Sequence, residues 1–226
     1  MGYGALSLKA SLTVSAASGK TLVNVGSAAN SGTTVNLNVP ITVSAGDLIL
    51  AVLSVRQGAT NTGPAGYTLV DDYIALTSTS MAEVLVYTKT ATGTETSVSA
   101  TSTRSSNGAA LQVWKIPGGA GVQTFQGGRG QSGAATAWSV GPFTPSTNNA
   151  IVIALWAGGT TITAGTYGVD AAWSSFTVVN TATGSNLGTA SIGWATQKQT
   201  TAAAATANFT ASVGVNNPTD YMIAVS

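Results

Sequence analysis

The chain of 226 residues contains no cysteine and no histidine. Without cysteine it has no disulfide, no thiolate metal site and no cysteine nucleophile. Without histidine it lacks the usual partner of a catalytic serine and the commonest metal ligand in proteins. We therefore expect no enzymatic activity, no catalytic residue and no cofactor.

Charge is scarce too: eight residues are basic and seven are acidic. The basic residues stand singly, whereas nucleic-acid binding needs a clustered basic face, so we expect no nucleic-acid partner. The longest apolar run, Leu48 to Leu53, is far shorter than the ~20 residues needed to span a bilayer, so we expect no membrane partner. Residues 1–6 also lack the pattern of an export signal.

The few acidic residues form no convincing constellation. Adjacent residues on a strand point to opposite faces, so Asp71 and Asp72 are not expected to act as a glycosidase pair. Asp71, Asp72, Asp170 and Asp220 have no calcium-loop spacing, and we expect them to be solvated loop acids.

What the chain does contain is the periodicity of β-strands. Apolar residues alternate with polar ones in residues 6–14 and 35–43, which predicts strands with one buried face. Leu48–Val55 and Ala150–Ala157 are continuously apolar, which favours strands buried on both faces. Further expected strands are Tyr67–Tyr73, Glu83–Lys89, Ala110–Ile116, Phe176–Val179, Ser191–Gln197 and Tyr221–Val225.

An internal duplication organises these strands. Asp47–Val52 resembles Asn149–Ala154, and Tyr67–Val70 resembles Phe176–Val179. Each half would leave an apolar face uncovered, so we favour two halves of one sandwich over two tandem β-domains. The predicted fold is an all-β, jelly-roll-like antiparallel β-sandwich built from two similar halves. Its parts are an N-terminal β arm or strand (1–34) and a sandwich (35–226), with halves at 35–117 and 134–226 and a Gly-rich crossover at 118–133.

Two groups of residues are candidates for contacts with other molecules. The alternating N-terminal segment could add to a sheet edge of its own sandwich or of a neighbour. Its candidate assembly contacts are Leu6, Leu8, Leu12 and Val14. Most aromatic residues fall in strand patterns and are expected in the core, but Tyr167 and Trp173 flank a loop and are the candidate exposed aromatics.

Three motifs in the first half stand in a familiar order. They are Ala45–Val52, then Pro64–Val70, then Val86–Ala91. This order resembles a broad group of jelly-roll-like β-sandwich domains in tailed-phage structural proteins and some bacterial surface proteins. The second of these motifs contains a P-x-G-[WY] turn at Pro64–Tyr67. The resemblance covers residues 35–116 well and the second half weakly, where Ala172–Phe176 stands in place of that turn. It implies a virion component and transfers no catalytic residue.

We therefore expect a non-enzymatic virion structural protein, namely a capsid decoration (cement) protein on the outside of a phage head. Its partners would be the major capsid protein or neighbouring virion proteins, and it would form a homotrimer. The alternative is a tail or head fibre component that binds a host receptor or a surface glycan through exposed aromatic side chains.

Overall fold

The computed structural model describes residues 13–15, 20–56, 58–74, 82–127, 134–158, 167–180, 191–216 and 219–226. These residues form antiparallel strands, and none of them belongs to a helix that could cross a membrane. The strands are β1 (Thr13–Ser15), β2 (Thr21–Pro40), β3 (Leu48–Arg56), β4 (Thr60–Thr62), β5 (Thr68–Ile74), β6 (Ala82–Thr90), β7 (Ser97–Ile116), β8 (Val122–Gln126), β9 (Ala134–Phe143), β10 (Ala150–Gly158), β11 (Tyr167–Val169), β12 (Ser174–Asn180), β13 (Ser191–Gln199), β14 (Ala205–Asn216) and β15 (Thr219–Val225).

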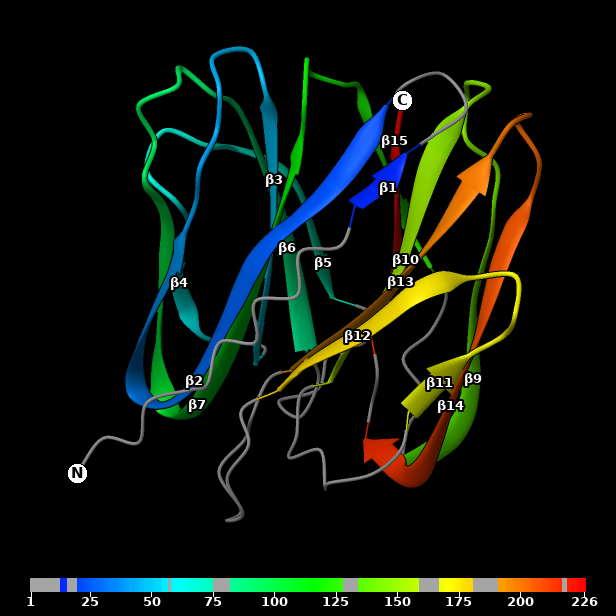
Figure 1. Ribbon diagram of the computed structural model, residues 1–226. Coiled ribbons are helices and arrows are strands. Elements are labelled where there is room, and N and C mark those ends of the chain that lie inside the picture. The colour runs from blue at the N-terminus through cyan, green and yellow to red at the C-terminus, as the bar shows by residue number, and fades with distance from the viewer. Residues whose placement is uncertain are drawn as a thin grey trace.

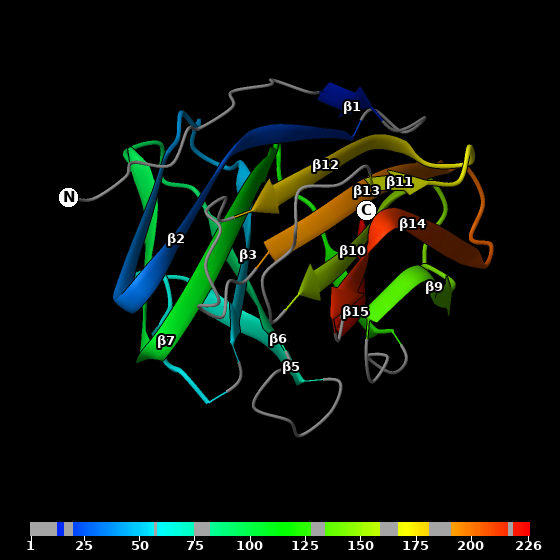
Figure 2. The same cartoon turned by 90° about the horizontal axis from the view of Figure 1, so that it is seen from below.

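The strands form three sheets, which Figures 1 and 2 show from two directions. The first sheet has the order β1-β2-β7-β3-β6-β5, with β4 added beside β7. The second has the order β12-β13-β10-β15-β8, and the third has the order β11-β14-β9. The long strands β2 and β7 curl the first sheet, so that their far ends, with β4, form a separate layer (Figure 1). The expected all-β antiparallel sandwich is confirmed.

The two halves repeat one pairing scheme. The order β2-β7-β3-β6-β5 in the first half matches β8-β15-β10-β13-β12 in the second. Likewise, β4 pairs with β7 as β11 pairs with β14, and the far end of β2 pairs with β7 as β9 pairs with β14. In the second half, β8 and β9 thus take the place of the two ends of β2, and β15 and β14 take the place of the two ends of β7.

The alignment read from the sequence is wrong by one residue at the first repeated strand. Gly46 (φ 87°) and Asn149 (φ 58°) occupy the same left-handed position in the turn before β3 and β10. Asp47 therefore matches Ala150, whereas the sequence pattern aligned it with Asn149. A shift of one residue exchanges the two faces of a strand, so the corrected register decides which side chains each core receives.

Three cores separate four layers of strands. The first-half core lies inside the curled first sheet and comprises Val35, Leu37, Val39, Ile41, Ile49, Ala51, Leu53, Val55, Leu85, Tyr87, Ala91, Val98, Ala100, Ala109, Leu111 and Val113. The second-half core lies between the second and third sheets and comprises Ala135, Trp138, Val140, Phe143, Ala150, Val152, Ala154, Trp156, Trp173, Ala195, Ala205, Ala207, Phe209, Met222 and Ala224.

The central core lies between the first and second sheets and joins the halves. It comprises Leu22, Ala29, Leu48, Leu50, Val52, Ala82, Val84, Val86, Ala110, Trp114, Ile116, Ile151, Ile153, Leu155, Ala157, Ile192, Trp194, Tyr221, Ile223 and Val225. Each half therefore has its own core. The second apolar face of each half packs against that of the other half, and this contact forms the central core. This is why β3 and β10 are apolar on both faces.

The halves meet with an approximate twofold relation. Strand β13 packs on β7 as β6 packs on β15, and β12 packs on β2 as β5 packs on β8. At the centre, the rings of Trp114 and Trp194 meet edge to face, with centroids 5.2 Å apart. The Trp194 indole also donates a hydrogen bond to Gln112 Oε1 at 3.2 Å. Such a self-complementary arrangement is the usual result of packing two copies of one surface together.

The N-terminal region departs from a simple arm. Strand β2 pairs with β7 from Val23 to Pro40, so the boundary predicted between residues 34 and 35 falls inside one strand. Val14 lies in β1, opposite Leu22 of β2. Leu6, Leu8 and Leu12 lie outside the described residues.

Asp220 is not the solvated loop acid that the sequence suggested, because it lies within β15 and is only 2% exposed. In the first half β7 pairs with β3, and in the second half β15 pairs with β10. When these two pairs are aligned, Asp220 of β15 takes the position that Leu111 has in β7. Its Oδ1 atom has no hydrogen-bond partner in the part of the chain that the structure describes. Burial raises the pKa of the Asp220 carboxyl to about 8, so the folded protein holds it protonated at neutral pH.

We predict that Asp220 makes the folded state progressively less stable as pH rises. Its pKa is about 8 when folded and about 3.9 when unfolded. Below about pH 4 the carboxyl is neutral in both states, and its full share of the free energy of unfolding is present. Between about pH 4 and pH 8 it ionises only in the unfolded state, so the free energy of unfolding falls by about 1.4 kcal/mol per pH unit. Denaturant unfolding of the wild type and Asp220→Asn between these limits should show a stability difference that grows with pH. Parallel profiles for the two proteins would contradict this assignment.

Candidate functional site

The two aromatic residues expected to be exposed do not form a surface site. Trp173 is only 6% exposed and belongs to the second-half core, so its expected exposure is wrong. Tyr167 is half-buried, and its ring centroid lies 5.8 Å from that of Trp156. Both side chains turn inward because the turn between β11 and β12 folds over the open end of the core between the second and third sheets.

An open strand edge lies at the corresponding place in the first half. β4 pairs with β7 only at Thr101–Thr103, so among the described residues β7 has no neighbouring strand on the β4 side from Ser97 to Ala100. The Thr96 carbonyl accepts a hydrogen bond from Ile41 N on the β2 side at 2.9 Å. Because backbone groups alternate in direction along an antiparallel strand, those of Ser97 and Ser99 face the open side.

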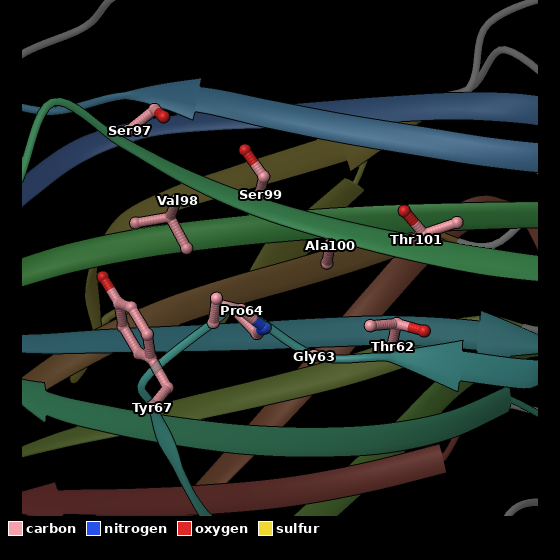
Figure 3. Close-up of a pocket in the computed structure, with 10 residues that line it drawn as sticks. Thr62, Gly63, Pro64, Tyr67, Ser97, Val98, Ser99, Ala100 and Thr101 are labelled. Atoms are coloured by element: carbon pink, nitrogen blue, oxygen red, sulfur yellow. The ribbon is translucent and has the colours of Figure 1, made fainter.

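A pocket of about 310 Å³ occupies this edge (Figure 3). One wall is the backbone of β7, and the other is the turn in which Tyr67 N donates to the Pro64 carbonyl at 3.2 Å. In Figure 3 the Tyr67 ring and Pro64 lie beneath Val98, while the hydroxyls of Ser97 and Ser99 point away from them. The pocket is lined by Thr62, Gly63, Pro64, Ala65, Tyr67, Ser97, Val98, Ser99, Ala100 and Thr101.

The same edge is closed in the second half. In the second half, β11 pairs with β14 as β4 pairs with β7. Aligning these two pairs matches Ser97 with Thr206 and Ser99 with Asn208. Asp170 accepts a hydrogen bond from Asn208 N at 3.0 Å and donates its own N–H to the Asn208 carbonyl at 3.1 Å. The Trp173 indole donates to the Thr206 carbonyl at 2.9 Å. Two residues thus satisfy the backbone that the first half leaves open.

This equivalence corrects a second alignment made from the sequence. Trp173 N donates to the Asp170 carbonyl at 3.1 Å, as Tyr67 N donates to Pro64. The turn therefore matches Tyr67 with Trp173, whereas the sequence pattern matched Tyr67 with Phe176. The P-x-G-[WY] signal misses this turn because its proline and glycine positions hold Asp170 and Ala172, and only the closing aromatic remains.

Electrostatics keep the pocket uncharged. Burial and, secondarily, the charge of Glu95 raise the pKa of Tyr67 to about 12, so its hydroxyl stays protonated. Lys89 Nζ lies 3.0 Å from Glu95 Oε1 and 5.6 Å from the centre of the Tyr67 ring. Hydrogen bonds from the Thr92 backbone, followed by Lys89, hold the pKa of Glu95 well below its usual range. The adjacent charges therefore pair with each other, and none of the described residues forms a hydrogen bond with Tyr67 Oη.

The acidic side chains on β5 face opposite ways, as their sequence positions suggested. Asp71 accepts hydrogen bonds from the Tyr221 hydroxyl and from Gln126 Nε2, which ties β5 to the second half. On the other face, Asp72 lies against Glu83. Burial, followed by the Asp72 charge, raises the Glu83 pKa to about 7. Across the described ranges, no three acidic side chains converge as metal ligands would.

Three exposed apolar side chains lie on β5, the edge strand of the first sheet, on either side of Asp71 and Asp72. β5 pairs only with β6, and Leu69, Val70 and Ile74 are 47%, 39% and 36% exposed. The matching edge strand β12 differs, because Phe176 and Val178 pack against the second-half core. An unpaired edge with apolar side chains is a template for contact with another chain.

Comparison with known proteins adds no relationship. No family model matches the chain, and no curated protein or solved structure is significantly similar to it.

We predict opposite consequences for matched substitutions at the closed and open edges. Trp173→Phe removes the hydrogen bond to the Thr206 carbonyl and should reduce the free energy of unfolding by about 1–3 kcal/mol. Tyr67→Phe removes a buried hydroxyl that has no partner among the described residues, so it should leave the free energy of unfolding unchanged or raise it. Denaturant unfolding of the two variants tests the difference, and equal losses would mean that the Tyr67 hydroxyl is bonded in solution.

Proposed function

We propose that this chain is a non-enzymatic structural component of a virus particle, a decoration protein that binds the outside of a capsid. The observation that carries the proposal is the exposed apolar edge of β5, formed by Leu69, Val70 and Ile74. It offers a contact surface on a chain whose other large apolar side chains, among the described residues, are buried or half-buried. The motifs at Ala45, Pro64 and Val86 support the same assignment through their resemblance to phage structural domains.

The proposed partners are the major capsid protein and further copies of this chain, arranged as a homotrimer. Decoration would act by mass action: a protein that binds only assembled shell subunits stabilises the shell relative to free subunits. The scarcity of charge suits close contacts between subunits, because few ionised groups would have to be stripped of water.

A fibre component that binds a receptor through Tyr167 and Trp173 is less well supported. Trp173 is buried and donates its indole N–H internally. These two residues therefore cannot form an exposed aromatic platform without unfolding the turn that holds them.

The decisive experiment counts this chain in purified particles by quantitative mass spectrometry against the most abundant shell protein. Decoration predicts a ratio near one to one. A handful of copies per particle would instead indicate a tail or vertex protein. Absence from particles would refute a virion role.

A substitution tests the β5 edge directly. Leu69→Ser combined with Val70→Ser should lower occupancy on capsids by at least about tenfold, because burying such side chains is worth about 1.5–3 kcal/mol each. The unfolding midpoint should stay nearly unchanged, since both side chains are exposed. Thr68→Ser on the same strand is the matched control. Unchanged occupancy of the double variant would remove β5 from the interface.

A further inference from the structure

The duplication provides an internal comparison for the pocket in the first half. Two copies of one strand edge have opposite states: Asp170 and Trp173 close the copy on β14, and the copy on β7 stays open. The residues that replace them in the first half are Pro64 and Tyr67. The difference between open and closed edges therefore rests on two positions in one turn.

Neither replacement can make the missing hydrogen bonds. Proline has no backbone N–H to donate, and it has no carboxylate to accept from the backbone N–H of Ser99. The Tyr67 hydroxyl is shielded from solvent and has no partner among the described residues, so it donates nothing to this edge. The pocket therefore presents the backbone carbonyl and N–H groups of Ser97 and Ser99, and no group of the described chain satisfies them there.

The shape of the site excludes an added β-strand. Thr62 pairs with Thr101, and continuing that register places Pro64 opposite Ser99. A strand added to β7 would have to pass through the position that Pro64 already occupies. The open volume is confined to about 310 Å³, which is the lower end of the range for small-molecule sites.

The chemistry of the lining selects a neutral ligand rich in hydroxyl groups. No carboxylate, ammonium or guanidinium group lines the pocket. A sugar hydroxyl both donates and accepts, so neighbouring hydroxyls can satisfy the Ser97 carbonyl and the Ser99 N–H together. Pro64, Ala65 and the Tyr67 ring supply an apolar wall for the C–H groups of a sugar ring.

We infer that the pocket between the Pro64–Tyr67 turn and β7 is a binding site for one neutral sugar unit, as found in a surface glycan. This function goes beyond capsid decoration and does not depend on it. The matching site in the second half cannot bind a sugar, because its own Asp170 and Trp173 occupy the same backbone groups.

The test is titration of the ¹⁵N-labelled protein with methyl glycosides of glucose, galactose, rhamnose and N-acetylglucosamine. Concentrations up to about 50 mM detect dissociation constants of about 1–10 mM, which is the range expected for a single sugar. At least one glycoside should shift the Ser97 and Ser99 amide signals saturably. The Thr206 and Asn208 amides should not move.

Variants separate the site from non-specific binding. Pro64→Asp with Tyr67→Trp installs the closing residues of the second half and should abolish the shifts. Tyr67→Phe keeps the ring and removes only a hydroxyl that solvent does not reach, so it should bind as the wild type does. Thr206→Ser on the closed edge is the control and should bind as the wild type does.

Three results would overturn the inference. The first is that no glycoside moves the Ser97 and Ser99 amides. The second is that the closed variant binds as tightly as the wild type. The third is that a peptide spanning residues 6–14 shifts these amides while every glycoside fails, which would assign the pocket to a chain segment.

Discussion

The burial of two apolar sheet faces against each other is the constraint on which the rest of this structure depends. β3 and β10 lie at the middle of their sheets and carry apolar side chains on both faces. Neither sheet could remain in water with the face that now lines the central core. The two halves must therefore fold together, and Trp114, Trp194 and Gln112 mark the contact where they meet.

The central contact also explains why polar groups tie the halves together at its edges. The Tyr73 hydroxyl donates to the Gly127 carbonyl at 3.0 Å, and Thr219 Oγ1 donates to the Ala82 carbonyl at 2.8 Å. Asp71 accepts from the Tyr221 hydroxyl. Each bond crosses from one half to the other, so loss of the central core would leave these groups without partners. Hydrogen bonds of this kind specify one alignment of two apolar surfaces that could otherwise slide.

Once the two halves share one core, their outer parts are free to diverge. The outermost layers face away from the central contact, and there the halves differ most. One edge of β14 is sealed by Asp170 and Trp173, and the matching edge of β7 borders a pocket. Similarly, β12 covers its core with Phe176, whereas β5 leaves Leu69 exposed. Both features proposed to contact other molecules therefore belong to the first half. The second half has the same strands at these places, but its own side chains cover them.

The sequence by itself determined the class of fold and the chemistry that is missing. Period-two alternation and the apolar runs at residues 48–55 and 150–157 predicted strands and a duplication, because side-chain periodicity depends only on local backbone geometry. Only the tertiary structure decided the register of the repeat, the burial of Trp173 and Asp220, and the open edge beside Ser97. These depend on contacts between segments far apart in the chain, and on which backbone groups those contacts leave without a partner, neither of which a local sequence pattern records.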